Sequence, residues 1–215
     1  MYIPGANAER DLPTLHAFID AHPLAILVTH AADGLVATHV PVLLDRAAGP
    51  NGSLTFHLAR ANAHARSLIE APTESLVIFS GPDAYISPEW YATKRETGRV
   101  VPTWNYVAVH AYGTPRTFDD AADLRAHLDA LTARHEGQRP QPWQVGDAPA
   151  DYIAQQMTAI VGVRFAIERL EGKWKMSQNR PAADIDGVIR GLGASPASRD
   201  REVADIVRER RPDTA

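Results

Sequence analysis

The sequence predicts a mainly β protein: a small antiparallel barrel of five or six strands, with helices at its ends and in its connections. Three observations carry this prediction. The 215 residues include 16 prolines and 14 glycines, which favour many turns over a helical bundle. The apolar segments are short, tend to alternate with period two and follow one another at hairpin-like spacing. Strands and helices do not alternate for long enough to build a doubly wound parallel sheet.

The first half of the chain holds the clearest hairpin signals. Asp11 precedes an apolar stripe at helical spacing and suits a helix cap, with Pro13 in the first turn. Gly34 marks a tight turn between two strands because glycine accepts positive φ freely. The elements expected here are, in order, a helix at 11–23, strands at 24–30, 35–45 and 53–60, a helix at 61–72 capped by Asn62, and a strand at 74–82.

The second half begins with an aromatic corner, where Ser87 caps a short helix that starts at Pro88. Farther along, Val107, Val109 and Ala111 share one parity and predict a strand with one buried face. The elements expected are, in order, a corner at 84–91, a polar connection at 92–99, a strand within 100–113, a helix at 119–138, a short helix at 147–157, a strand pair or one bent strand at 159–178 with a bulge near 169–172, and helices at 184–192 and 198–211.

We expect two parts in the chain. Residues 1–192 should form the barrel domain, and residues 193–215 should form a C-terminal helical tail. No internal repeat and no low-complexity segment interrupts this organisation.

Composition excludes several classes of protein. The chain has no cysteine, which rules out disulfides, thiolate catalysis and cysteine-ligated zinc. Its formal net charge is −4, so it lacks the overall basic character of a nucleic-acid binder. No apolar run approaches the roughly 20 residues of a membrane span, and no signal peptide is evident. We therefore expect a cytoplasmic protein without a membrane partner.

Common catalytic and metal signatures are missing. The sequence contains no G-x-G-x-x-G, Walker A, H-E-x-x-H or G-x-S-x-G motif, and it singles out no catalytic residue. Nine histidines are scattered along the chain, and His30, His39 and His57 lie on neighbouring expected strands. Since no carboxylate stands at ligand spacing beside them, we predict ordinary strand histidines and no metal site.

One strand-to-helix turn gathers groups that suit a phosphate. Arg60, Asn62, His64 and Arg66 place donors around the start of a helix, where backbone N–H groups and the helix dipole favour an anion. The alternative is a capped surface helix with solvated arginines.

Two further segments concentrate polar and aromatic groups. Lys173, Lys175, Ser177 and Asn179 share one face at the end of a strand, which is also a common composition for a plain strand terminus. A planar ligand such as a flavin ring, or ordinary packing, would account for five polar-tipped aromatic residues within about twenty positions: Tyr85, Trp90, Tyr91, Trp104 and Tyr106.

Four segments together resemble the PaiB-like family, described as FMN-binding negative transcriptional regulators. They are "FHLARANAHARSL", "YISPEWYATK", "VVPTWNYVAVHAYG" and "KWKMSQNRP", in the expected order, and the resemblance covers roughly residues 1–192. The family is related to the FMN-binding split barrels of pyridoxamine-phosphate oxidases and flavin reductases. The resemblance implies a six-stranded antiparallel split β-barrel with flanking helices, usually a homodimer with FMN at the subunit interface.

The resemblance also implies positions for the cofactor. Its phosphate would lie near Arg60, Asn62 and His64, and its isoalloxazine ring would lie beside Thr38, His39 and Val40. Further flavin contacts, some from the partner subunit, would come from Trp104, Asn105, Lys175, Ser177 and Gln178. His64 stands where many split barrels have a lysine or arginine. We therefore hypothesise a modest or pH-dependent affinity for FMN.

Three functions stay open at this stage. The first is an FMN-binding protein with regulatory output, as the resemblance implies, and the second is an FMN-dependent, NAD(P)H-linked oxidoreductase on the same fold. The third is a cofactor-free barrel that binds a partner. Direct DNA contact has weak support, because the C-terminal arginines lie in a helix of mixed charge.

Overall fold

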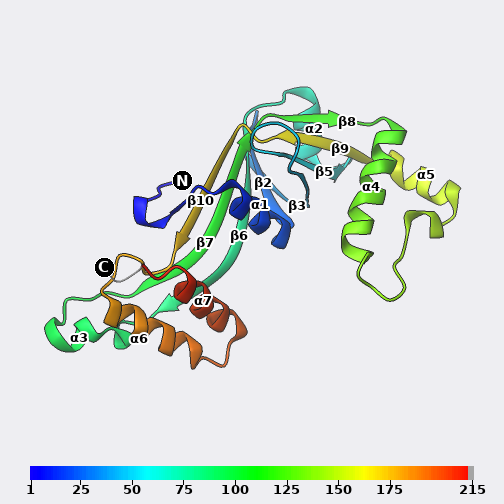
Figure 1. The fold of residues 1–215 in the computed structure, drawn as a ribbon. Helices are drawn as coiled ribbons and strands as arrows, with labels where there is room; N and C mark the ends of the chain where they lie inside the picture. Colours follow the sequence, from blue (N-terminus) through cyan, green and yellow to red (C-terminus); the bar gives the residue numbers. More distant parts are fainter. Residues whose placement is uncertain (213–215) are drawn as a thin grey trace. The chain divides into compact units, whose positions relative to one another are not determined.

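The computed structural model describes residues 1–212 and confirms a mainly β architecture with flanking helices (Figure 1). The described residues contain ten strands: β1 (Ala8–Glu9), β2 (Leu24–Ala31), β3 (Gly34–Pro41), β4 (Leu43–Asp45), β5 (Ser53–Ala59), β6 (Ser75–Ile86), β7 (Thr103–Gly113), β8 (Pro115–Phe118), β9 (Ile160–Ala166) and β10 (Arg169–Lys175). The helices are α1 (Leu12–Ala21), α2 (Ala63–Glu70), α3 (Ala92–Thr97), α4 (Ala121–Glu136), α5 (Ala150–Thr158), α6 (Ala182–Gly193) and α7 (Ser198–Glu209), with short 3₁₀ turns η1 (Gly5–Asn7), η2 (Pro88–Trp90) and η3 (Val145–Asp147).

The strands pair into two sheets. One has six strands in the order β1-β10-β7-β6-β2-β3, and the other has four in the order β4-β5-β9-β8. Within residues 1–212 neither sheet closes on itself, so the expected single six-stranded barrel is replaced by two sheets. The prediction missed β1, β4 and β8 as separate strands because segments of two to four residues are too short to show alternation.

The chain divides into two compact units, and β6 and β7 each begin in one and continue into the other. Unit 1 comprises Met1–Leu15, Ser80–Val109 and the chain from Glu171 onward, and unit 2 comprises His16–Phe79 and His110–Leu170. Each unit is described by itself below.

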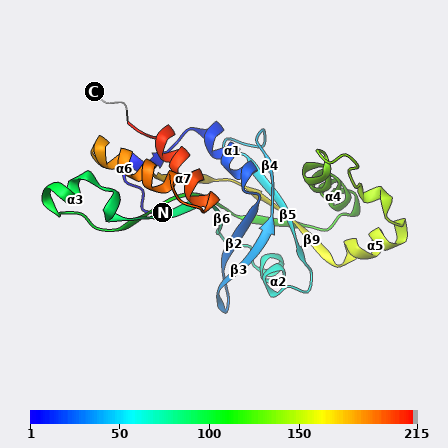
Figure 2. The same cartoon turned by 90° about the horizontal axis from the view of Figure 1, so that it is seen from below.

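In unit 2, the β2–β3 hairpin and the four-stranded sheet form the framework. The hairpin pairs Leu24 with Pro41 and Ala31 with Gly34, whose φ of 112° meets the expectation for the turn. The inward faces of β5 and β9 supply the core through Leu54, Phe56, Val163 and Phe165. Helix α2 packs against β2, β3 and β8, while α4 and α5 lie side by side next to β9 (Figures 1 and 2).

In unit 1, α6 and α7 pack side by side, and α6 also contacts α3 and η2 (Figure 2). The close approach to η2 depends on Gly187, since a Cβ there would lie 1.8 Å from the Trp90 carbonyl oxygen. Helix α7 lies within the expected tail, and positions 213–215 of that tail lie outside the described residues.

Most expected elements are confirmed, with one clear exception. The expected polar connection at 92–99 is wrong, because this segment contains α3, which ends at Gly98 in the left-handed conformation. Its side chains are mainly polar and charged, so the sequence shows no apolar stripe that would reveal a helix. Of the two alternatives near the C-terminus, a strand pair or a bent strand, the structure has two separate strands, β9 and β10, which lie in different sheets; the break falls at Ile167–Glu168, just before the expected bulge.

Candidate functional site

The eleven expected cofactor-binding residues fall into two groups, one in each unit. Unit 2 holds those on β3 and around the start of α2: Thr38, His39, Val40, Arg60, Asn62 and His64. Unit 1 holds those at the start of β7 and around the end of β10: Trp104, Asn105, Lys175, Ser177 and Gln178.

Asn62 caps α2, as the sequence predicts. Its side-chain oxygen accepts a hydrogen bond from the backbone N–H of His64 at 2.9 Å, and its amide nitrogen donates to the Thr38 hydroxyl at 3.4 Å. The cap orients the first turn of α2, where backbone N–H groups lack helical partners. Arg66 is exposed in this turn and donates to the Ala61 carbonyl at 3.2 Å.

His64 is fully buried, in contrast to its neighbour Arg66. Its Nδ1 lies 2.9 Å from the Thr38 hydroxyl, and its Nε2 lies 2.9 Å from the Thr29 hydroxyl. Burial lowers the pKa of the imidazole below its ordinary value, which favours the neutral ring. The expected contact between His64 and a phosphate stays a prediction, and both ring nitrogens already have protein partners.

The other two β3 residues show strand alternation. His39 is exposed, whereas Val40 is buried and pairs across the hairpin with Ala25. Thr38 is half-buried and turns its hydroxyl to His64. A cavity of about 310 Å³ adjoins this region, lined by residues of the hairpin turn and by α2 residues that include Ala63, His64 and Arg66.

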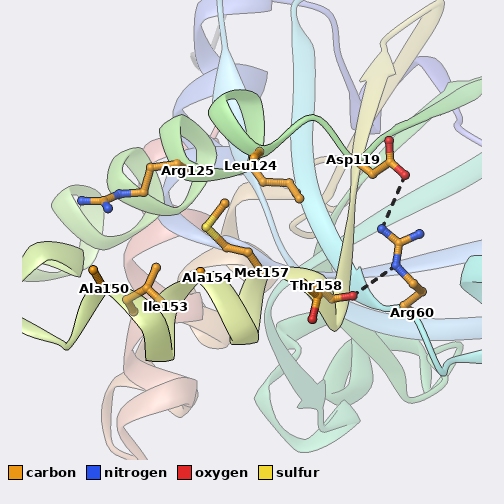
Figure 3. A pocket seen from close by; sticks show the side chains of 10 residues that line it. Arg60, Asp119, Leu124, Arg125, Ala150, Ile153, Ala154, Met157 and Thr158 are labelled. Carbon is orange, nitrogen blue, oxygen red and sulfur yellow. Dashed lines mark hydrogen bonds and ion pairs between the residues drawn. The ribbon is translucent and has the colours of Figure 1, made fainter.

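Arg60 lines a different cavity of about 650 Å³, whose apolar surface comes from α4 and α5 (Figure 3). Its Nε donates to the Thr158 carbonyl at 3.3 Å, and its Nη2 donates to the Ile160 carbonyl at 3.1 Å. The Asp119 carboxylate lies 3.6 Å from Nη2. Met157 extends from α5 toward Leu124 on α4 (Figure 3). The Arg60 guanidinium therefore holds the end of α5 by hydrogen bonds, while one side of the guanidinium stays exposed to solvent.

In unit 1, Asn105 and Ser177 form a buried pair. The Asn105 amide donates to the Ser177 hydroxyl at 3.1 Å, and the Ser177 hydroxyl lies 3.2 Å from the Asn105 carbonyl oxygen. Ser177 has a φ of 64°, which is rare outside glycine and marks a constrained backbone. Such conformations cluster at ligand sites because surrounding contacts must hold them.

The side chains of Lys175 and Gln178 form hydrogen bonds with other groups of unit 1. The Lys175 ammonium donates to the Thr103 hydroxyl and, at 2.8 Å, to the Trp104 carbonyl. Burial lowers the pKa of Lys175, and neighbouring cations, Lys173 and Arg180, act in the same direction. The Gln178 amide bonds the backbone of Trp174 and Met176, which closes the end of β10.

Trp104 and Tyr85 form an exposed aromatic pair in the same unit. Their ring centroids lie 5.9 Å apart at an interplanar angle of 72°, and about half of each side chain is exposed. Large exposed aromatic groups suit a planar ligand because they offer apolar area at little entropic cost.

The residues present fit FMN by the chemistry of their donors. The start of α2, Asn62 and Arg66 supply neutral and cationic donors of the kind that phosphate needs. The exposed pair of Tyr85 and Trp104 offers apolar surface of the kind that a flavin ring contacts. No group of three or more His, Asp or Glu side chains within residues 1–212 is arranged to hold a metal ion.

Sequence reasoning missed Thr29 and Ser75, which complete the hydrogen bonds around His64. One signal was available: Thr29 shares the parity of the buried Ala25 and Leu27, so a polar group stands at a buried strand position. Such a group needs a partner. No local pattern identifies that partner, because His64 lies 35 positions away.

Comparisons with known proteins identify the family. The model of the family described as "Putative FMN-binding domain" matches residues 1–169. An uncharacterised protein from Aspergillus fumigatus is 36% identical over 98% of this chain and 97% of its own length. "Protease synthase and sporulation protein PAI 2" from Bacillus subtilis is 28% identical over 98% of both chains.

A solved structure shows the same fold. The FAD and heme binding protein from Mycobacterium smegmatis has a TM-score of 0.58 and 18% identity, with 79% of this chain and 73% of that chain covered. In the described part of the chain, no helix is long and apolar enough to cross a membrane. FMN, the cofactor expected from the sequence, is the ligand by which the matching family is described. The chain therefore belongs to the PaiB-like family of FMN-binding domains.

Proposed function

We propose that the chain binds FMN with the phosphate at the start of α2, on the split-barrel fold of its family, and acts as a homodimeric regulator of the PaiB type. The observation that carries the binding site is the first turn of α2. Asn62 fixes this turn, Arg66 stands exposed in it, and a cavity of about 310 Å³ adjoins both α2 and the β2–β3 turn. A helix N-terminus with an adjacent guanidinium is a favourable place for a phosphate dianion.

Unit 1, taken by itself, offers a candidate surface for a flavin ring. Trp104 and Tyr85 supply exposed aromatic surface, and the buried pair Asn105–Ser177 holds the neighbouring backbone. We assign Thr38 and Val40 to the region beside the phosphate site rather than to direct ring contacts, because Val40 is buried and Thr38 bonds His64, whereas His39 is exposed and stays a candidate ring contact. Bound FMN would supply redox chemistry from its own ring system, so none of these residues needs to act as an acid or base.

Two ligands test the phosphate site. FMN and riboflavin share the ring and differ in the phosphate, so titrations that follow flavin fluorescence separate the two ends. We expect wild-type protein to prefer FMN, and Arg66→Gln to lose about tenfold in FMN affinity while riboflavin affinity holds. Arg95→Gln, an exposed arginine of unit 1, is the control. Equal affinity for both flavins in wild type would refute the phosphate site.

Regulation by direct DNA contact through α7 has little support from the structure. Arg199 pairs with Asp83 at 3.3 Å, and Arg201 donates to the Ser195 and Pro196 carbonyls at 2.8 Å. The remaining arginines of this segment also have acidic partners: Arg208 with Asp205, Arg210 with Glu9 and Arg211 with Asp186. This surface is charge-balanced, and phosphate binding needs net positive charge. We propose that regulation works through a protein partner or through the state of the bound flavin. Any contact with DNA is made by a part of the protein other than α7.

A mobility-shift experiment tests this part of the proposal. We expect the purified protein to shift promoter fragments no better than random DNA of equal length. Any complex that forms should be unaffected by the double change Arg199→Gln and Arg201→Gln. A sequence-specific complex that weakens steeply with salt and disappears in that variant would refute it. NAD(P)H-dependent bleaching of the bound flavin would indicate the alternative, an oxidoreductase.

A further inference from the structure

His64 has an environment that fixes the position of its hydrogen atoms. Its ring is fully buried between β2, β3 and the first turn of α2. Hydroxyl groups occupy both ring nitrogens, Thr29 at Nε2 and Thr38 at Nδ1, each at 2.9 Å. A hydroxyl can donate or accept, so the direction of each bond follows from the next group along the chain of bonds.

The Nε2 side starts from Ser75. Its hydroxyl donates to the Thr73 carbonyl at 3.0 Å, a group that only accepts. Because a serine has one hydroxyl hydrogen, the 2.7 Å bond between Thr29 and Ser75 must use the hydrogen of Thr29. Thr29 then has only a lone pair left for His64. The ring must therefore carry a hydrogen on Nε2.

The Nδ1 side ends at Asn62. Its oxygen accepts from the backbone N–H of His64, which assigns the amide nitrogen to the Thr38 side. That nitrogen donates to the Thr38 oxygen at 3.4 Å, and Thr38 is free to donate its own hydrogen to Nδ1. Each hydroxyl hydrogen of Ser75, Thr29 and Thr38 is then used in one hydrogen bond. All of these hydrogen bonds can form when the His64 ring is neutral.

We infer that His64 is a positioning residue, held as the neutral Nε2–H tautomer, and that it orients Thr38 and the Asn62 cap so that the first turn of α2 faces the phosphate. This inference rests on the proposed function. The cofactor would meet the backbone of α2, the second amide hydrogen of Asn62 and Arg66, and His64 would act through Thr38 without touching the ligand. Its role thus differs from that of a lysine or arginine, which many split barrels have at this position.

Charged groups around the ring do not oppose this assignment. The charged and titratable groups near the ring are all exposed. Those that line the adjoining cavity are Asp33, Arg66 and Glu70. Those on the neighbouring strands are His30 on β2, His39 on β3 and Arg116 on β8. Their fields are screened by water, while Thr29 and Ser75 on the buried side are neutral. Burial also lowers the pKa of His64, in agreement with a neutral ring.

The tautomer can be measured directly in cofactor-free protein. Long-range ¹H–¹⁵N spectra distinguish a protonated from a bare ring nitrogen for each histidine. We expect a protonated Nε2 and a bare Nδ1 for His64 from pH 8 down to below its ordinary pKa. Thr29→Val removes the acceptor of the Nε2 hydrogen, so the ring should shift toward the Nδ1–H tautomer. Thr55→Val, which changes a β5 threonine away from the ring, should leave the tautomer unchanged.

Flavin titrations connect the tautomer with the site. Thr29→Val should weaken FMN about tenfold and leave riboflavin affinity unchanged, since the effect passes through the phosphate end. A wild-type ring with Nδ1 protonated, or an equal loss of both flavins in Thr29→Val, would overturn the inference. If wild-type protein binds no flavin, the proposed function fails, and the spectra still decide whether His64 is held as the neutral Nε2–H tautomer.

Discussion

Asn105 and Ser177 lie 72 positions apart in the chain and face each other as a hydrogen-bonded pair, with the asparagine fully buried. The pair joins the start of β7 to the segment that follows β10. It also fixes the side chain of Ser177, a residue whose backbone is in the left-handed conformation.

We predict that Asn105→Ala lowers the free energy of unfolding by about 1–3 kcal/mol, because it leaves the buried Ser177 hydroxyl without its partner. Urea denaturation followed by tryptophan fluorescence measures the change. Asn179→Ala, at an exposed position in the same segment, should change stability by less than about 0.5 kcal/mol. Equal stability of the two variants would contradict the role of the pair.

The histidine pair His57–His127 predicts a pH dependence of stability. His57 Nδ1 lies 3.0 Å from His127 Nε2, and burial together with His57 lowers the pKa of His127 from 6.5 to about 4. The unfolded chain therefore takes up a proton at His127 more readily than the folded protein. Stability should be full above pH 6.5 and fall by about 3 kcal/mol as the pH drops toward 4.

Denaturation at a series of pH values checks this prediction. His127→Gln removes the titrating ring, so the stability of this variant should depend less on pH between 6.5 and 4. His135→Gln, at an exposed position on the same helix, should keep the wild-type slope. A slope of wild-type size in His127→Gln would show that other groups cause the dependence.

We predict that a methyl group added at Gly187 destabilises the protein by a steric clash. An alanine Cβ would lie 1.8 Å from the Trp90 carbonyl oxygen, so α6 or η2 must move. We expect Gly187→Ala to destabilise the protein by about 1–3 kcal/mol, although alanine is the better helix former. Thermal melts should show no loss for Gly193→Ala, since nothing lies within 4 Å of a Cβ there. A neutral Gly187→Ala would mean that α6 and η2 separate easily.

We predict that a change at Trp104 affects flavin binding but not folding. Its side chain is half exposed, so Trp104→Ala should leave the melting temperature nearly unchanged. If the ring of the flavin stacks there, affinity for FMN and riboflavin should fall by the same factor, about three- to tenfold. Trp143→Ala changes a tryptophan of similar exposure in unit 2 and should retain full affinity for both. Retained affinity in Trp104→Ala would remove this residue from the site.

Much of the fold follows from local patterns. Val107, Val109 and Ala111 are buried as their alternation predicts, and Asn62 and Ser87 cap the elements that they precede. Helix α3 could not be predicted from local patterns, because its charged residues give no periodic apolar signal, and Gly98 at its C-terminal end does not by itself define a helix.

The candidate site was predictable in part. Residue types and spacing indicate Asn62 and Arg66 at a helix start, because the cap and the dipole act over one turn. The hydrogen bonds of His64 were not predictable, since the hydroxyls that bind its ring come from Thr38 and Thr29, 26 and 35 positions away. The orientation of Arg60 likewise depends on carbonyls about a hundred positions later.

Helix α5 has no buried residue, although Ile153 and Met157 face α4 across an open cavity. Few contacts are lost when it unfolds, so its amide hydrogens should exchange through local opening at a low free energy. Arg60, bonded to the carbonyls of Thr158 and Ile160, lies where such an opening would reach the sheet. We therefore expect this arginine to mark the boundary between a segment that opens alone and strands that exchange only when the whole unit unfolds.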